Sequence, residues 1–361
     1  MRSPNPVLAA SFTLPTEVAV IVSRWGRRLS ESLEAGLNQY LPQVLRSASL
    51  PQGPCSRSFR ALNSSRPLDV PQGHGRRRCV LTLRTPAKVN IGLWVERRRP
   101  DGYHELRSLF FPVSLFDRLS FEAREQGGIE LSCEIPHVPS DSKNLVWRAA
   151  DLYFTYTGVR SGIRVDLKKG IPVGHGLGGG SSDAAATLLG LDRLFNTRLS
   201  RDELHSLAIE LGMDCPFFLD PRPCLVTGRG ERMEPLNVPS FDLVIYSPGF
   251  GISTRWAYKQ LKRLTNGKNP CKLLAKALRE RRYHEASQWL YNSFEEVVYK
   301  RCPELERMVG WFVSNGAWFA GLSGSGSALF AAVGPDVEVS LPAGVRGRLF
   351  CVRTLEHWGV V

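Results

Sequence analysis

The sequence predicts an α+β fold, built either as two domains or as one large one. Three observations support this prediction. The chain has 361 residues, of which 43% are hydrophobic, and this content excludes a wholly disordered chain. From Cys79 onward, segments with strand-like alternation are interleaved with segments of helical periodicity. A glycine-rich stretch, residues 174–180, connects a predicted strand to a predicted helix.

The chain from Cys79 onward divides into predicted strands and helices. Residues 79–95 are rich in β-branched side chains and predict two strands with a short break between them. Residues 109–122 predict a strand with a turn at Ser114–Asp117. Further strands are expected at 128–134, 162–167, 241–247, 318–322, 328–333 and 348–353. Helices are expected at 144–156, 181–195, 200–211, 269–291 and 293–315, the third of them starting with a Ser200–Glu203 capping box.

The first 80 residues differ in composition from the rest of the chain. They contain eleven Arg, no Lys and four acidic residues, so they carry +7 of the formal net charge of +13. Residues 16–46 have the spacing of one amphipathic helix, whereas residues 48–78 lack any sustained period and predict a linker or disordered tail. Three interpretations stay open: a start codon placed too early, an organelle transit peptide, or an arm that binds nucleic acid.

Composition and spacing also exclude several classes. No stretch approaches the roughly 18 consecutive apolar residues of a membrane span, so we expect no membrane partner. The eight cysteines are dispersed, without C-x-x-C or zinc-site spacing, and this pattern suggests a reducing compartment. The basic pI of about 9.6 suggests nucleic acid, but the body lacks a patch of interleaved Arg and aromatic residues, so we expect no such partner.

The sharpest motif is the run from Gly174 to Ser182, with five glycines in its first seven residues. Glycines let the backbone approach a ligand and adopt positive φ, and the start of the following helix adds partial positive charge. Two hydroxyls stand at the helix start. This combination predicts a cradle for a polyphosphate, and the alternative is a glycine-rich turn without a ligand.

Three known phosphate motifs do not account for this run. Gly180 stands where a Walker A loop requires Lys. The spacing G-x-G-x-x-G is present, but Asp192, about 20 residues on, falls within a predicted helix rather than at a strand end. The V-A-I-K and H-R-D motifs of protein kinases are absent from the sequence.

Four further motifs are ambiguous when each is taken alone. Asp214 follows a predicted helix among apolar residues, so it is either a turn residue or a functional carboxylate. Lys88 is either a solvated strand residue or part of a site. The segment 101–106 (DGYHEL) predicts a hairpin turn. The segment 323–327 (SGSGS) is either a second backbone nest or a flexible turn.

Together and in this order, the motifs resemble the GHMP superfamily of small-molecule kinases. The resemblance runs from about Thr82 to the C-terminus and rests on PAKVNIGL (86–93), RRPDGYHEL (98–106), NLVWRAADL (144–152), KKGIPVGHGLGGGSSDAA (168–185), GMDCPFFL (212–219), SPGFGIST (247–254), NSFEEV (292–297) and LSGSGSALF (322–330). PAK-x-N with DGYHEL is similar to the branch that acts on 4-diphosphocytidyl-2-C-methyl-D-erythritol.

The resemblance implies a two-lobed α+β architecture. An N-terminal α/β lobe, residues 80–245, would hold the phosphate loop, and a C-terminal ferredoxin-like lobe, residues 246–361, would close the cleft; residues 1–79 would be an extension. It also implies ATP as co-substrate, Mg²⁺, and transfer of the γ-phosphoryl group to the 2-hydroxyl of the methylerythritol unit. A bacterial cytoplasmic enzyme, monomeric or weakly dimeric, is expected, or a plastid one if the extension is a transit peptide.

The family's site residues carry over only where the motifs match. Lys88 and Asp214 would be the catalytic pair, with Asp214 accepting the hydroxyl proton and Lys88 keeping it ionised. The ATP site would comprise Asn144, Lys169, Pro172, Gly174, Gly176, Leu177, Gly178, Gly179, Gly180, Ser181 and Ser182, with Ser182 also at the magnesium. The substrate site would comprise Asn90, Tyr103, His104 and Tyr258, with Trp256 as the alternative stacking residue. His175 departs from the family's commoner Gly or Ala.

Two rival functions stay open. One is a kinase of the same superfamily with another alcohol substrate, and the other is a nucleotide-binding protein without catalytic activity. The presence of both Lys88 and Asp214 argues against the second.

Overall fold

Two long antiparallel strands, β1 (Val80–Arg98) and β2 (His104–Arg124), form the backbone of the larger sheet in the computed structural model, which describes residues 80–265 and 270–359. The predicted break within 79–95 and the predicted turn at 114–117 are both wrong, because each strand is continuous. Pro86 pairs with Phe116 but Ala87 pairs with Val113, so the two residues between Val113 and Phe116 form a bulge. The sequence pattern correctly predicted an irregularity at residues 114–117 but assigned it to a turn instead of a bulge.

The larger sheet has the order β3–β4–β2–β5–β6, with β1 paired to the other edge of β2. Strands β3 (Gly128–Cys133) and β4 (Gly162–Lys168) were predicted, whereas β5 (Cys224–Gly228) and β6 (Arg232–Pro235) were not. The turn between β1 and β2 spans Arg99–Tyr103 and confirms the hairpin predicted from DGYHEL.

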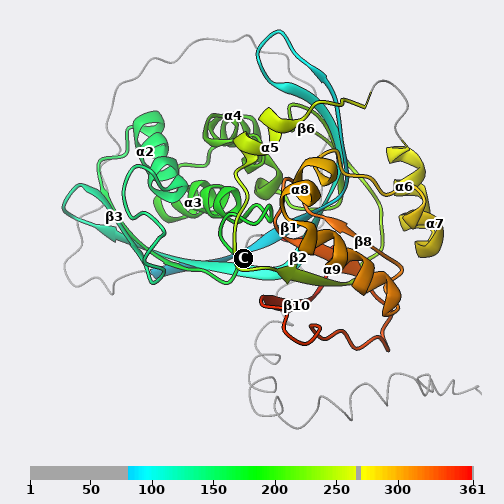
Figure 1. Cartoon of the computed structure of the whole chain (residues 1–361). Coiled ribbons are helices and arrows are strands. Elements are labelled where there is room, and N and C mark those ends of the chain that lie inside the picture. Colours follow the sequence, from blue (N-terminus) through cyan, green and yellow to red (C-terminus); the bar gives the residue numbers. More distant parts are fainter. Residues whose placement is uncertain (1–79, 266–269, 360–361) are drawn as a thin grey trace, which may run out of the picture. The chain divides into compact units, whose positions relative to one another are not determined.

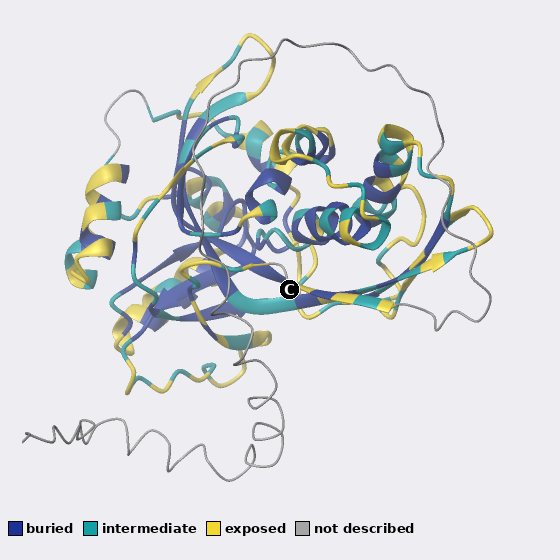
Figure 2. Ribbon diagram, turned by 180° about the vertical axis from the view of Figure 1, so that it is seen from behind, coloured by how far each residue is buried: buried dark blue, intermediate teal, exposed yellow. Residues whose placement is uncertain are grey.

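Three helices cover one face of this sheet (Figure 1): α2 (Leu145–Thr157), α3 (Gly179–Phe195) and α4 (Arg201–Leu211). Their inward sides are buried, and their apolar side chains form one core cluster with β1, β2 and β4 (Figure 2). The capping box is confirmed: Glu203 N donates to Ser200 Oγ over 3.2 Å, and Ser200 N donates to Glu203 Oε2 over 2.8 Å. A short 3-10 turn, η1 (Cys215–Leu219), follows α4.

The smaller sheet is antiparallel, with the order β10–β7–β9–β8. Its strands are β7 (Asp242–Ser247), β8 (Phe319–Leu322), β9 (Leu329–Ala332) and β10 (Arg348–Arg353). Strand β6 ends at Pro235 and β7 begins at Asp242, so the smaller sheet starts a few residues before residue 246, where the C-terminal lobe is expected to begin. The predictions for residues 1–79 lie outside the described residues.

Five helices accompany the smaller sheet: α5 (Thr254–Gln260), α6 (Cys271–Arg279), α7 (Tyr283–Ser287), α8 (Glu295–Arg301) and α9 (Pro303–Ser314). The two long helices expected at 269–291 and 293–315 are therefore each divided. Arg281 has φ +57°, which is incompatible with a right-handed helix. Pro303 has no N–H to donate and begins α9. No helix among the described residues combines the length and apolar character needed to cross a bilayer.

Gly190 tests how tightly α3 packs on the sheet. An added Cβ there would lie 2.7 Å from Phe121 Cε2 of β2, whereas one at Gly310 of α9 would have no neighbour within 4 Å. Alanine normally stabilises a helix interior by roughly 0.5–1 kcal/mol relative to glycine, and overpacking costs about 1–3 kcal/mol. We expect Gly190→Ala to lower the free energy of urea unfolding and Gly310→Ala to raise it; stabilisation by both would contradict this packing.

Candidate functional site

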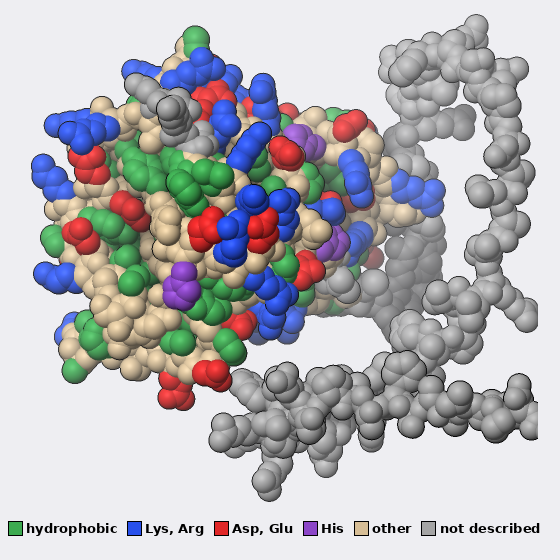
Figure 3. Space-filling view, turned by 90° about the vertical axis from the view of Figure 1, so that its right-hand side faces the viewer, with side chains coloured by type: hydrophobic (Ala, Val, Ile, Leu, Met, Phe, Trp, Pro, Cys, Tyr) green, Lys and Arg blue, Asp and Glu red, His purple; other side chains and the backbone are tan. Residues whose placement is uncertain are grey.

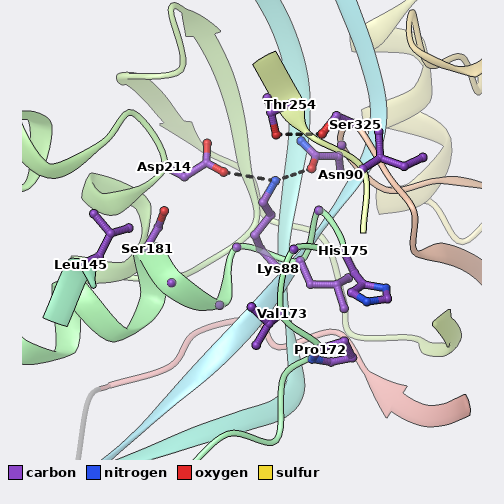
Figure 4. A pocket seen from close by; sticks show the side chains of 18 of the residues that line it. Lys88, Asn90, Leu145, Pro172, Val173, His175, Ser181, Asp214, Thr254 and Ser325 are labelled. Carbon is purple, nitrogen blue, oxygen red and sulfur yellow. Dashed lines mark hydrogen bonds and ion pairs between the residues drawn. The ribbon is translucent and has the colours of Figure 1, made fainter. Parts of the chain in front are cut away.

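A cavity of about 530 Å³ lies at the N-terminus of α3. Its wall combines β1, the loop that joins β4 to α3, the turn before η1, and segments beside the smaller sheet, among them Thr254 and Ser325 (Figure 4).

In space filling, one face of the molecule shows basic and acidic side chains intermingled (Figure 3).

The glycine-rich loop has the conformation that its sequence predicts. Gly174, Gly176 and Gly178 have φ of +77°, +80° and +73°, a region that L-residues rarely adopt. Gly178 is the N-cap of α3 and supplies no side-chain cap, so the first N–H groups of the helix are available to a ligand. The geometry therefore provides a backbone anion site on the cavity wall.

Lys88 and Asp214 meet across this cavity. The Lys88 Nζ lies 3.4 Å from Asp214 Oδ2, although the residues belong to β1 and to the turn after α4. The Lys88 side chain is 5% exposed, and that of Asp214 is 36% exposed. A buried ammonium is costly without a partner. The pairing therefore favours the functional interpretation of both residues over a solvated lysine and a simple turn aspartate. Lys88 is not a solvated strand residue.

The surroundings of Lys88 fix its direction. Its Nζ donates to Asn90 Oδ1 and lies 4.5 Å from the centre of the Phe110 ring. Asn90 in turn donates through Nδ2 to Ser108 Oγ over 2.9 Å. These contacts leave the ammonium directed at Asp214 and the cavity (Figure 4).

Lys169 and Asn144 line the cavity as predicted but are already engaged by protein groups. Lys169 Nζ forms ion pairs with Asp117 and, over 2.7 Å, with Asp183, all three side chains being nearly fully buried. Burial raises the pKa of Asp183 well above its usual range, opposed by the Lys169 charge. Asn144 accepts from Val146 N and caps α2. Asp117 was not singled out from the sequence, and Asp183 was only the alternative carboxylate to Asp214; the available signal for Asp183 was its place next to the small, buried residues 184–186.

Ser182 does not lie on the cavity wall, which corrects its assignment to phosphate and metal. Its hydroxyl donates to Pro86 O over 2.6 Å, contacts Thr85 Oγ1 at 2.5 Å and is fully buried. Ser182 therefore ties α3 to β1, and the neighbouring Ser181 is the hydroxyl that lines the cavity. Pro172, Leu177 and the glycines Gly174, Gly176, Gly178, Gly179 and Gly180 line it as predicted.

An aromatic group forms the other end of the site. Tyr258 lines the cavity, stacks on His104 with centroids 5.0 Å apart, and contacts Phe294 edge-on at 4.9 Å. Burial, with a smaller contribution from Asp214, raises the Tyr258 pKa, and burial lowers the His104 pKa. His104 does not itself line the cavity.

Two other aromatic side chains face elsewhere. The ring centre of Trp256 lies 4.4 Å from the guanidinium carbon of Arg301, and Trp256 does not line the cavity, whereas Tyr258, Phe110 and Phe294 do. Tyr103 is 48% exposed beneath Arg229 and, like His104, lies outside the cavity lining.

Two further polar groups on the wall were not singled out by the sequence. The hydroxyls of Thr254 and Ser325 are 2.9 Å apart, and both residues line the cavity (Figure 4). His175 sits within the glycine loop and is buried, and burial lowers its pKa.

Comparison with known proteins gives the class of this fold and site. The model of the GHMP kinases N terminal domain matches residues 144–220, and that of the GHMP kinases C terminal domain matches residues 274–340. A homoserine kinase from Cytophaga hutchinsonii has the same fold, with a TM-score of 0.59 and 16% identity over 81% of this chain and 100% of the other.

Nearer relatives narrow the class. The 4-diphosphocytidyl-2-C-methyl-D-erythritol kinase of Chloroherpeton thalassium is 40% identical over 72% of this chain and 91% of its own length. A crystal structure of 4-(cytidine 5'-diphospho)-2C-methyl-D-erythritol kinase is 37% identical, with a TM-score of 0.66 over 76% of this chain and 99% of the other. The chain therefore belongs to the 4-diphosphocytidyl-2-C-methyl-D-erythritol kinase family of GHMP kinases.

Gly178 tests the loop geometry. A Cβ there would lie 2.9 Å from Lys88 Cγ and 2.8 Å from Phe218 Cζ, at φ +73°. Gly249 has φ +87° with nothing within 4 Å of an added Cβ, so it is a control for backbone strain alone. We expect Gly178→Ala to weaken ADP binding about tenfold or more by calorimetric titration, from an overpacking cost of about 1–3 kcal/mol. Equal effects of Gly178→Ala and Gly249→Ala would contradict the assignment.

Proposed function

We propose that this chain transfers the γ-phosphoryl group of ATP to the 2-hydroxyl of 4-diphosphocytidyl-2-C-methyl-D-erythritol, in the non-mevalonate route to isoprenoid precursors. The observation that carries the proposal is the Lys88–Asp214 pair, held 3.4 Å apart on the wall of the glycine-loop cavity. Membership of the family supports the substrate. The assay that tests it compares phosphorylation of this alcohol with that of mevalonate and homoserine.

The residues would act mainly by position and charge, as is usual in phosphoryl transfer. Asp214 is exposed enough to meet a substrate hydroxyl and would accept its proton. Lys88 is buried, so its charge acts on Asp214 and on the entering oxygen with little screening by water. The N–H groups at the start of α3 would hold the phosphates and so orient the γ-phosphoryl group toward the attacking hydroxyl.

Mg²⁺ is part of the proposal. Among the described residues, no group of three or more His, Cys, Asp or Glu could hold a metal ion by itself. This fits Mg²⁺, which binds through one or two carboxylates together with substrate phosphates and waters. Asp183 has a buried Oδ1 without a hydrogen-bond partner and, like Ser181, lines the cavity, so these two residues would supply the oxygen ligands in place of Ser182. When bound, the ion would neutralise charge on the β- and γ-phosphates.

The aromatic end of the cavity supports a substrate that carries a base. Tyr258 would stack on the cytosine, with His104 beside it and Tyr103 at the rim, and Asn90 would contact the reacting part of the substrate. A kinase for a small alcohol such as homoserine has no need of such a group. A bacterial cytoplasmic location, the plastid alternative, the monomeric or weakly dimeric state and the lack of a nucleic-acid partner stay predictions.

Tyr258 tests this base site. Tyr258→Ala removes the ring from the cavity, so we expect a higher KM for the cytidyl substrate with a smaller change in kcat. Tyr258→Phe keeps the ring and should stay near the wild-type KM. Trp256→Ala is the control, because Trp256 packs under Arg301. A raised KM in Trp256→Ala alone would move the stacking role to Trp256.

The catalytic pair is tested by single-turnover transfer. Asp214→Asn keeps the shape and removes the base, so we expect kcat to fall roughly 10²–10⁴-fold while ATP still binds. Lys88→Met should cost a similar factor, and the double variant should be little worse than either. Asp220→Asn is the matched control, since Asp220 pairs with Arg222 at the far end of η1. Near-normal transfer by Asp214→Asn would remove Asp214 from the mechanism.

A further inference from the structure

His175 is the only polar side chain in the loop segment 174–180, whose other side chain is the buried Leu177. The residue lies between two left-handed glycines, with φ of +77° at Gly174 and +80° at Gly176. These turns let the imidazole leave the loop toward the smaller sheet. Its Nδ1 lies 3.1 Å from the hydroxyl of Ser247, the last residue of β7, and 3.2 Å from that of Ser327.

The hydrogen bonds indicate which nitrogen carries the proton. The Ser327 hydroxyl donates its single proton to the carbonyl of Phe250. Toward His175 it can then only accept, so the Nδ1–Ser327 contact is a hydrogen bond in the tautomer that carries the proton on Nδ1, and Ser247 then accepts as well. Burial lowers the pKa of His175, which agrees with a neutral ring.

The backbone of the loop is docked at the same place. Ala328 N donates to His175 O over 3.0 Å, and Ser323 Oγ donates to Gly176 O over 3.3 Å. The approach is so close that a Cβ on Gly176 would lie 2.4 Å from Ser323 O. The backbone of the glycine loop therefore packs directly against segment 323–328. The His175 side chain adds hydrogen-bond contacts to Ser247 and Ser327 at the same place.

We propose that His175 is a positioning residue that fixes the glycine loop against the smaller sheet and so sets its N–H groups for the phosphates of ATP. The choice of ATP as the ligand rests on the proposed function. Glycine-rich backbone has a large conformational entropy to lose on ordering, and ordering it before the ligand arrives improves affinity. His175 itself lines the cavity, and releasing its attachment weakens nucleotide binding while the Lys88–Asp214 pair is left unsubstituted.

The experiment compares three variants at one position. The amide of His175→Asn can place a donor where Nδ1 lies, whereas the amide of His175→Gln reaches the place of Nε2 instead. His175→Ala should raise the Kd for ADP and the KM for ATP roughly 5- to 30-fold, with the KM of the alcohol changed less than about twofold. His175→Asn should recover most of the affinity, and His175→Gln should not.

A second variant tests the partner. Ser247→Ala should weaken ADP binding less than His175→Ala, and adding it to His175→Ala should change nothing further, because the two residues share one interaction. Urea unfolding of every variant identifies those that fail to fold.

Two results would overturn the proposal: wild-type ADP affinity in folded His175→Ala, or equal affinities of the Asn and Gln variants. ADP binding is measured without the alcohol, so a wild-type protein that binds ADP but does not phosphorylate the cytidyl substrate would contradict the proposed function alone.

Discussion

The site depends on one constraint, the burial of the Lys88 ammonium. A cation that is 5% exposed must be met by acceptors, and the chain supplies Asn90 from the same strand and Asp214 from a turn far along the sequence. Asp214 reaches β1 from the N-cap of η1, directly after α4. The burial of Lys88 also explains Gly178, since any side chain there would displace Lys88. One buried charge thus links the strand, the turn and the loop.

The glycine loop belongs to both sheets. On one side Lys88 N donates to Leu177 O over 2.9 Å, which ties the loop to β1. On the other side His175 O accepts from Ala328 N beside the smaller sheet. Because most of the loop lacks side chains, these contacts to its backbone and the one polar side chain define its conformation. A ligand therefore meets donors that the fold has already ordered.

Much of this arrangement could be predicted from the sequence, and the failures have physical causes. The glycine run predicted a phosphate cradle on its own, whereas Lys88 and Asp214 were ambiguous when each was taken alone, and only the resemblance of the motifs together paired them. The long helices were wrong because apolar periodicity continues across Arg281 and Pro303 while the backbone does not. Strand β6 (RMEP) has no apolar alternation, whereas β5 (CLVTG) carries a short apolar run between Pro223 and Gly228 that was not assigned.

Ser182 shows the limit of carrying over a motif residue by residue. Adjacent positions at a helix start point about 100° apart, and here Ser181 lines the cavity while the Ser182 hydroxyl is turned toward β1. Sequence spacing alone does not say which of the two lines the cavity.

The Asp117–Lys169–Asp183 group lies beside the ends of the glycine loop. Its three charges are nearly fully buried, and such groups rarely add net stability compared with apolar packing. Its value is positional. Asp117 also accepts from Gly170 N over 2.7 Å and Ile171 N over 2.9 Å, at the point where β4 gives way to the loop. Lys169 joins that point to α3 through Asp183, so the loop is held at both of its ends by one ionic cluster. An apolar substitute could fill the volume but could not fix the two backbone N–H groups, which explains the use of buried charge here.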